Sequence, residues 1–320
     1  MIHKIISVLS IILNRLRVQL LLCLVFGCSF IHAQQDMMYT QYMNNMLNIN
    51  PAYAGNRTVN NITSLLRKQW VNIDGALTIG SVSWDYRGED SRVGYGIQAY
   101  TDKLGVETNT GFQVFYSYHI QFNKSSLIFG LSGGIVNYRA AFLTGTDPTT
   151  GGGVDPLFSN DLNTLKPTAG VGALYSTNNW YVGLSAPSLL TTTVYNNNHE
   201  VVSMDNKRYF LTGGYIFNAS SVLKLKPSVM FKTVAGAALQ YDFNLNAWVN
   251  NVVGFGVSYR HDDAVAGMVD FQIAPGFTLG YAYDYLTSSL KKYSAGSHEL
   301  MLRFEFSKGK PQRIQSPRYY

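Results

Sequence analysis

The stretch from Leu239 to Val249 constrains the fold most, because its side chains alternate between two kinds. Odd-numbered positions carry Leu, Tyr, Phe, Leu, Ala and Val, whereas the even-numbered positions before Trp248 carry only Gln, Asp and Asn. A period of two predicts a β-strand with one apolar face and one polar face. The stretch is longer than the roughly 5–6 residues usual in soluble sheets and matches the roughly 9–11 residues that a tilted strand needs to cross a bilayer. A single strand of this kind also fits a soluble sandwich, so the recurrence of the pattern decides.

The same alternation recurs along most of the chain, in about fourteen segments separated by turn residues. The expected strands are Thr58–Val71, Ala76–Arg87, Arg92–Thr101, Val106–Phe122, Ser125–Arg139, Thr168–Thr177, Trp180–Ala186, Arg208–Phe217, Val222–Thr233, Ala238–Val249, Val252–His261, Ala264–Ile273, Phe277–Leu286 and His298–Phe306. Two turn-rich loops, Ala140–Leu165 and Ser188–Asn206, are longer than the other connections. Short turns alternating with long loops are typical of outer-membrane barrels, and an even strand count leaves both chain ends on one side. The sequence therefore predicts an all-β protein with a single antiparallel transmembrane β-barrel.

Composition favours one large membrane barrel over two soluble domains. Charged residues make up 14% of the chain, against roughly 25% in soluble domains. The 22 Tyr and 17 Phe residues suit the aromatic girdles of a membrane barrel. In the last expected strand, Leu300, Leu302 and Phe304 share one face, and Glu299 and Arg303 share the other. Charges at alternate positions of an apolar strand indicate a polar lumen.

Residues 1–33 have the pattern of a secretory signal peptide. A basic start precedes the apolar run Val18–Phe30, and Ile31-His32-Ala33 fits a cleavage site. The run is shorter than the roughly 20 residues of a spanning helix, which favours a cleaved signal over a membrane anchor. Cleavage removes Cys23 and Cys28, so the mature chain is expected to have no disulfide. Its mild basicity does not indicate a nucleic-acid partner.

Two segments flanking the expected strands have no strand pattern. Residues 34–57 are rich in Asn, Gln, Met and Tyr, and we predict either a plug or a periplasmic strap that contacts a partner. Barrels of about eight strands are filled by their own side chains, whereas those of about sixteen leave a channel, so an intermediate barrel has room for a plug. The plug would lie in or across the periplasmic mouth, with its amides paired to Asp242, Asn244 and Arg303. Residues 307–320 form a basic tail that we expect to be mobile.

The arrangement of polar residues does not favour catalysis. His261-Asp262-Asp263 fits a hairpin turn as well as a catalytic carboxylate–histidine site. Ser117 and His119 share a strand face, where we expect them to point the same way without contact and without a third orienting group. Gly151-Gly152-Gly153 is not followed by the Lys or helix of a phosphate-binding loop, and the His residues have no metal-ligand spacing. We therefore predict that the protein is not an enzyme and needs no cofactor or metal.

Several short stretches together resemble a known family. The most specific is Asn50-Pro51-Ala52-Tyr53-Ala54-Gly55. The others are Gln35-Asp36, Tyr39-Thr40-Gln41-Tyr42-Met43, Arg67-Lys68-Gln69-Trp70, Leu223-Lys224-Leu225-Lys226-Pro227-Ser228, Asp263-Ala264-Val265, Gly280-Tyr281-Ala282-Tyr283-Asp284-Tyr285 and Gly296-Ser297-His298-Glu299-Leu300-Met301-Leu302. From about Gln35 to Phe306 the chain resembles the PorP/SprF family of outer-membrane proteins, associated with type IX secretion in Bacteroidetes. One departure is Met37, where many members have Pro.

The resemblance implies a role in secretion without catalysis. Relatives act in the secretion of proteins that carry a C-terminal sorting domain, including gliding adhesins, and either hold the adhesin at the cell surface or work with the periplasmic ring of the secretion machine. We therefore expect a non-catalytic barrel in the cell outer membrane that supports secretion, surface anchoring or both. Its expected partners are outer-membrane lipid, the periplasmic ring components and a secreted adhesin-like protein, and no small-molecule substrate is expected. The motif residues that we expect to contact a partner or to form the plug are Asp36, Tyr39, Gln41, Tyr42, Asn50, Pro51, Tyr53, Gly55, Arg67 and Trp70.

Two other functions are consistent with a barrel. The first is an outer-membrane porin or transporter for small or lipidic solutes, for which ion conductance would be the distinguishing property. The second is an outer-membrane hydrolase, which the scattered Ser, His and Asp residues support least.

Overall fold

The computed structural model describes residues 38–57, 59–88, 90–142, 161–195, 201–204, 207–234 and 237–306. The predicted signal peptide and the predicted tail lie outside these ranges. The chain divides into two units, and the strands all lie in the unit formed by residues 36–235 and 239–320. In the described ranges no helix has the length and apolar character to cross a membrane.

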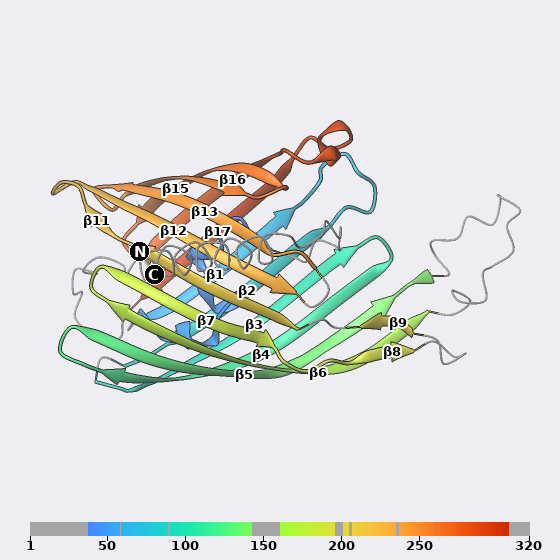
Figure 1. Cartoon of the computed structure of the whole chain (residues 1–320), viewed down its shortest axis with the longest axis horizontal. Helices are drawn as coiled ribbons and strands as arrows, with labels where there is room; N and C mark the ends of the chain where they lie inside the picture. Colours follow the sequence, from blue (N-terminus) through green and yellow to red (C-terminus); the bar gives the residue numbers. More distant parts are fainter. Residues whose placement is uncertain are drawn as a thin grey trace, which may run out of the picture. The chain divides into compact units, whose positions relative to one another are not determined.

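One antiparallel sheet of fourteen long strands dominates the fold (Figure 1). Its strands are β1 (Asn60–Lys68), β2 (Thr78–Tyr86), β3 (Val93–Leu104), β4 (Glu107–Gln121), β5 (Ser125–Ala140), β6 (Leu162–Thr177), β7 (Trp180–Ser188), β10 (Arg208–Tyr215), β12 (Leu223–Val234), β13 (Gln240–Val249), β14 (Val253–Arg260), β15 (Ala264–Ala274), β16 (Phe277–Leu286) and β17 (Ser297–Phe306). A two-residue strand, β11 (Phe217–Asn218), pairs with β12 beyond the end of β10.

The sheet closes into a barrel. β1 pairs with both β2 and β17, and β10 pairs with both β7 and β12. Each of the fourteen long strands therefore has a neighbour on both sides, which removes the exposed edges of an open sheet. The prediction of a single antiparallel barrel of about fourteen strands is confirmed.

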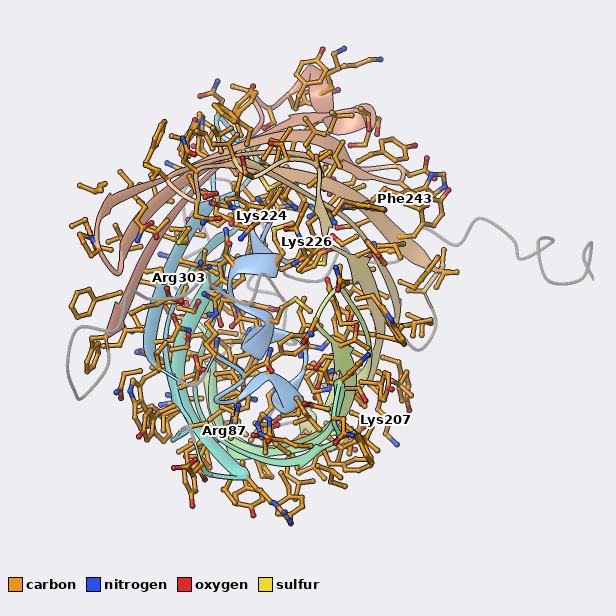
Figure 2. All side chains as sticks on the ribbon, turned by 90° about the vertical axis from the view of Figure 1, so that its left-hand side faces the viewer. Arg87, Lys207, Lys224, Lys226, Phe243 and Arg303 are labelled. Carbon is orange, nitrogen blue, oxygen red and sulfur yellow. The ribbon has the colours of Figure 1, made fainter. Side chains whose placement is uncertain are left out.

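The strands turn their apolar side chains outward and their polar side chains inward. In β13, Phe243 and Leu245 are 50% and 47% exposed, whereas Asp242 and Asn244 are 1% and 4% exposed. Figure 2 shows Phe243 on the outer side of the wall. The facing predicted for this stretch is confirmed. A barrel with this distribution has its hydrogen-bonding backbone groups paired within the sheet and presents an apolar surface to lipid.

The two ends of the barrel differ in their connections. The short-turn end contains the start of β1, the end of β17 and tight turns such as 178–179 and 275–276. The long-loop end contains the connections 69–77, 141–161 and 189–207. It lies on the right in Figure 1, where β8 and β9 are labelled. This asymmetry is the one expected of a barrel with short periplasmic turns and long outer loops.

β6 begins earlier than the sequence predicts. It starts at Leu162 rather than Thr168, because residues 162–167 continue the antiparallel register with β5, from Ala140 opposite Leu162 to Ile135 opposite Pro167. Proline lacks a backbone N–H and usually marks a strand boundary, which made Pro167 look like part of a loop.

The predicted loop Ser188–Asn206 contains a small hairpin. Its strands β8 (Thr193–Tyr195) and β9 (Val201–Met204) pair with each other and form a sheet separate from the barrel. Val194 is 2% exposed and packs against Tyr138 and Ala140 of β5. The polar composition of this region hid the hairpin, because the residues that bury Val194 belong to β5 and are far from it in the sequence.

Candidate functional site

The lumen of the barrel is filled by residues 38–57, which we call the N-terminal segment (Figure 2). It forms three short 3-10 helices, η1 (Tyr42–Asn44), η2 (Met46–Asn48) and η3 (Pro51–Tyr53). Its apolar side chains pack against inward-facing residues of the strands and form the main core of the molecule. That core includes Tyr42, Met43, Met46, Ile49, Ala52 and Tyr53 of the segment and Leu65, Ile128, Leu174, Met230 and Met301 of the wall.

The upstream end of the segment is held by three buried charged residues, Arg67, Asp284 and Glu299, which we call the Thr40 clamp. The backbone N–H groups of Thr40 and Gln41 donate to the two carboxylate oxygens of Glu299, at 2.7 and 2.8 Å. The Thr40 hydroxyl donates to Asp284 at 2.7 Å and accepts from Arg67 at 2.6 Å. Arg67 also pairs with Asp284 at 2.7 Å and Glu299 at 3.3 Å. Buried charges are costly without partners, so the segment helps to stabilise the clamp as well as being held by it.

Arg260 extends this cluster across the neighbouring strands. Its guanidinium pairs with Asp242 at 3.2 Å and Asp263 at 3.1 Å, and lies 3.9 Å from Asp284. Four acidic side chains thus lie around the two arginines, and Lys232 acts on Asp242 as a further positive charge. No group of His, Cys, Asp or Glu side chains in the described ranges is arranged to hold a metal ion.

The middle of the segment contacts two of the three strand residues expected to bind it. Asn244 donates to the Tyr42 hydroxyl at 2.7 Å, and Arg303 donates to the Asn44 carbonyl at 2.7 Å. Asp242, the third expected partner, binds Arg260 instead. At these two strand residues the segment offers a tyrosine hydroxyl and a backbone carbonyl, whereas its amides bind elsewhere on the wall, as Asn45 does in donating to Ser83 at 2.9 Å.

The family-like stretch at residues 50–55 lies directly against backbone of the wall. The Asn50 side chain accepts from the Ala52 N–H at 2.9 Å and donates to the Ala173 carbonyl at 3.1 Å. A Cβ at Gly130 would lie 2.1 Å from the Ala52 nitrogen, and one at Gly172 would lie 1.9 Å from Asn50 Oδ1. The segment therefore fits because β5 and β6 have no side chains at these two inward positions.

The downstream end turns toward β1 at Gly55. This residue has a φ of 64°, a left-handed conformation that favours glycine. Its N–H donates to Asp85 at 3.1 Å, and its carbonyl accepts from Arg87 at 3.1 Å. Just upstream, the ring of Tyr53 meets that of Tyr181 edge to face, with centroids 6.4 Å apart.

The segment runs along the lumen from one end of the barrel to the other. Thr40 is bound by Arg67 and Asp284, which lie near the long-loop ends of β1 and β16. Gly55 is bound by Asp85, near the short-turn end of β2. The plug hypothesis placed the segment at the periplasmic mouth, whereas the described residues extend beyond that mouth to the clamp.

The predicted site residues fall into two groups. Tyr39, Gln41, Tyr42 and Arg67 meet near the clamp, where Trp70 also packs on the core and donates its backbone N–H to the Ser297 hydroxyl at 3.2 Å. The other group, toward the short-turn end, contains Asn50, Pro51, Tyr53 and Gly55. Asp36 lies outside the described residues.

Sequence reasoning missed Thr40, Asp284 and Glu299 as binding residues. All three stand within stretches that carried the family resemblance, and both acids occupy inward positions of otherwise apolar strands. That combination was a usable signal, although it did not indicate which charges would meet.

Ser117 and His119 are in contact, so the expectation that they would not touch is wrong. Ser117 Oγ lies 3.0 Å from His119 Nε2, because the long imidazole leans along the strand toward its neighbour. The hydroxyl donates to the Ala54 carbonyl at 2.6 Å, and both side chains are buried. The pair therefore holds the segment against β4.

A closed antiparallel barrel with an apolar outer surface and a filled polar lumen defines an outer-membrane β-barrel. The fold is similar to that of the Ralstonia pickettii toluene transporter TbuX, with a TM-score of 0.51 and 10% identity over 82% of this chain and 93% of that chain. Acinetobacter baumannii outer membrane protein Omp33 gives a TM-score of 0.47 and 10% identity, over 78% of this chain and 98% of that chain. At 10% identity the likeness to the toluene transporter shows the fold alone.

The family is identified by sequence. The model of the family described as "Type IX secretion system membrane protein PorP/SprF" matches residues 31–304, and the chain belongs to this family. The resemblance seen in the sequence is thus confirmed. None of the curated proteins matches the chain. The protein is an outer-membrane barrel of type IX secretion, and family membership implies association with components of that system.

Proposed function

We propose that this protein is a non-catalytic docking barrel, closed by its N-terminal segment, that supports secretion or surface anchoring of proteins with a C-terminal sorting domain, such as gliding adhesins. The observation that carries the proposal is the burial of the segment along the lumen, where every residue from Tyr39 to Asn56 except Asn44 and Asn48 is buried. An open channel needs a continuous wet path, and a lumen packed like a protein core does not provide one. This favours a docking role over the porin alternative.

The two ends of the barrel suit different partners in this proposal. In barrels of this kind the short turns face the periplasm, so the ring components would bind at the short-turn end. The secreted protein would be held at the long-loop end, where the β8–β9 hairpin presents Tyr195 and Val201, each 55% exposed. Non-catalytic action is supported by the use of the Ser117 hydroxyl to hold Ala54.

Closure is tested by ion conductance in planar bilayers. The intact protein is expected to conduct little, whereas a variant lacking residues 35–52 is expected to insert and to conduct as an open pore. A variant lacking the hairpin residues 193–204, with its segment intact, serves as the control and is expected to stay closed. Open-pore conductance of the intact protein would support the porin or transporter alternative instead. A truncated barrel that stays closed and no longer co-purifies with periplasmic partners would support the strap.

Docking is tested by affinity purification of the native protein followed by mass spectrometry. Recovery of ring components together with a protein that carries a C-terminal sorting domain is the expected result. Their absence from a preparation in which the barrel itself is folded would contradict the docking role.

A further inference from the structure

The Thr40 clamp has the chemistry of a peptide-binding site. Glu299 accepts two consecutive backbone N–H groups, and Asp284 and Arg67 together bind one hydroxyl group. These are contacts to the backbone and to a Thr side chain, so a peptide with Thr or Ser followed by a residue other than proline can supply them if it adopts the turn that Thr40 and Gln41 form here. We propose that the clamp is a peptide-binding site, filled here by residues 38–41 of its own chain, that accepts a segment of the same chemistry from a secreted partner.

Burial of the clamp favours exchange of one peptide for another over simple emptying. The side chains of Asp284 and Glu299 are 2% and 0% exposed. If the segment left, the two carboxylates would lose the Thr40 and Gln41 donors and keep only their arginine partners. Buried acceptors without donors are strongly unfavourable, so the site selects a ligand that restores the same donors.

The position of the clamp suits a partner that arrives from outside. Arg67 is one residue from the end of β1, and Asp284 and Glu299 are each two residues from the ends of their strands, all on the long-loop side. In barrels of this class that side faces the exterior. A peptide entering there meets the clamp before the rest of the lumen. This inference rests on the proposed docking function and names the site and the ligand class for it.

Gln41 offers a matched pair of variants in the full-length protein. Gln41→Pro removes the N–H that binds Glu299, and the φ of −89° at this position is close to the range of proline. Gln41→Ala keeps the N–H, and the side-chain amide nitrogen that it removes makes no hydrogen bond. Detergent-solubilised proteins are titrated against a fluorescent peptide of residues 38–41, the part of the segment that fills the clamp, and binding is read by anisotropy.

The Gln41→Pro protein is expected to bind the peptide at least tenfold more tightly than the wild-type and Gln41→Ala proteins, whose clamps stay filled. Adding Glu299→Gln to Gln41→Pro should return binding to the wild-type level. A peptide with Thr40→Val should bind the Gln41→Pro protein at least tenfold more weakly, and one with Thr40→Ser should bind normally. Equal binding by the Gln41→Pro and wild-type proteins would overturn the proposal. So would a binding affinity that changes neither with Glu299→Gln in the protein nor with Thr40→Val in the peptide.

If Gln41→Pro loses the heat-modifiable gel shift of a folded barrel, Thr40→Val in the protein takes its place, with Thr40→Ser as control and the same expectations. These measurements distinguish failure of the exchange site from failure of the proposed docking function. A closed intact protein that never binds the peptide contradicts only the exchange site. An intact protein that conducts contradicts the docking barrel, whatever the peptide does.

Discussion

At the scale of residues, the fit of the segment depends on positions without a side chain. Gly130 on β5 is in backbone contact with Ala52, so the methyl group of an alanine would overlap the Ala52 nitrogen. Gly133 lies three residues along the same strand, and a Cβ there would meet nothing within 4 Å. Both substitutions add one methyl group to the same strand, so a difference between them reports on the segment.

Gly130→Ala is expected to displace the segment and Gly133→Ala to leave it in place. Displacement should appear as ion conductance in planar bilayers and as faster cleavage of the segment by an added protease, because overpacked sites force the backbone to move. Both variants should keep a folded barrel by gel shift. If Gly130→Ala remains as closed and as protease-resistant as Gly133→Ala, then Ala52 does not lie against β5.

At the scale of elements, β13 separates the lipid-facing and the lumen-facing sides of the wall. Leu245 is near the middle of the strand and points outward, and Val249 is the outward residue at its end. An Arg at the bilayer midplane costs about 2–4 kcal/mol, and one near the interface costs about 0–1 kcal/mol. Leu245→Arg should therefore lower the folded yield in vesicles far more than Val249→Arg, as measured by the gel shift. Equal yields would place Leu245 away from the midplane.

An Arg substitution at Asn244, the inward neighbour of Leu245, is expected to have a different effect from the one that a water-filled lumen would predict. Its side chain is 4% exposed and binds the Tyr42 hydroxyl. An Arg at this position would therefore compete with the segment for space rather than extend into water. The filled lumen changes the consequence of an inward substitution from harmless to disruptive.

The sequence predicted best the strands whose own side chains alternate between apolar and polar residues. The facing of Phe243 and Asp242 follows from alternation alone. The β8–β9 hairpin was missed because its anchoring residue, Val194, is held by distant residues of β5. The clamp was missed for the same reason, since Thr40 and Glu299 are 259 residues apart in the chain. Local patterns show that a charge points inward, whereas the barrel's closure decides which charges meet.

At the scale of the whole molecule, the direction of insertion decides what the clamp can bind. The unequal ends predict that the short turns face the periplasm and that the clamp faces outward. Asp74, in the connection after β1, and Asn123, in the turn after β4, are both exposed and lie at opposite ends. Because both positions are exposed, a difference in their labelling would report the side of the membrane on which each one lies.

Single cysteines at these two positions test the orientation. The natural cysteines, Cys23 and Cys28, both lie in the predicted signal peptide, so the mature background is expected to be free of thiols. In intact cells, a membrane-impermeant maleimide should label Asp74→Cys, and Asn123→Cys should be labelled only after the outer membrane is permeabilised. The reverse pattern would mean that the long loops and the Thr40 clamp face the periplasm. A peptide would then reach the clamp before export, so the site would act on partners in transit rather than on proteins held at the surface.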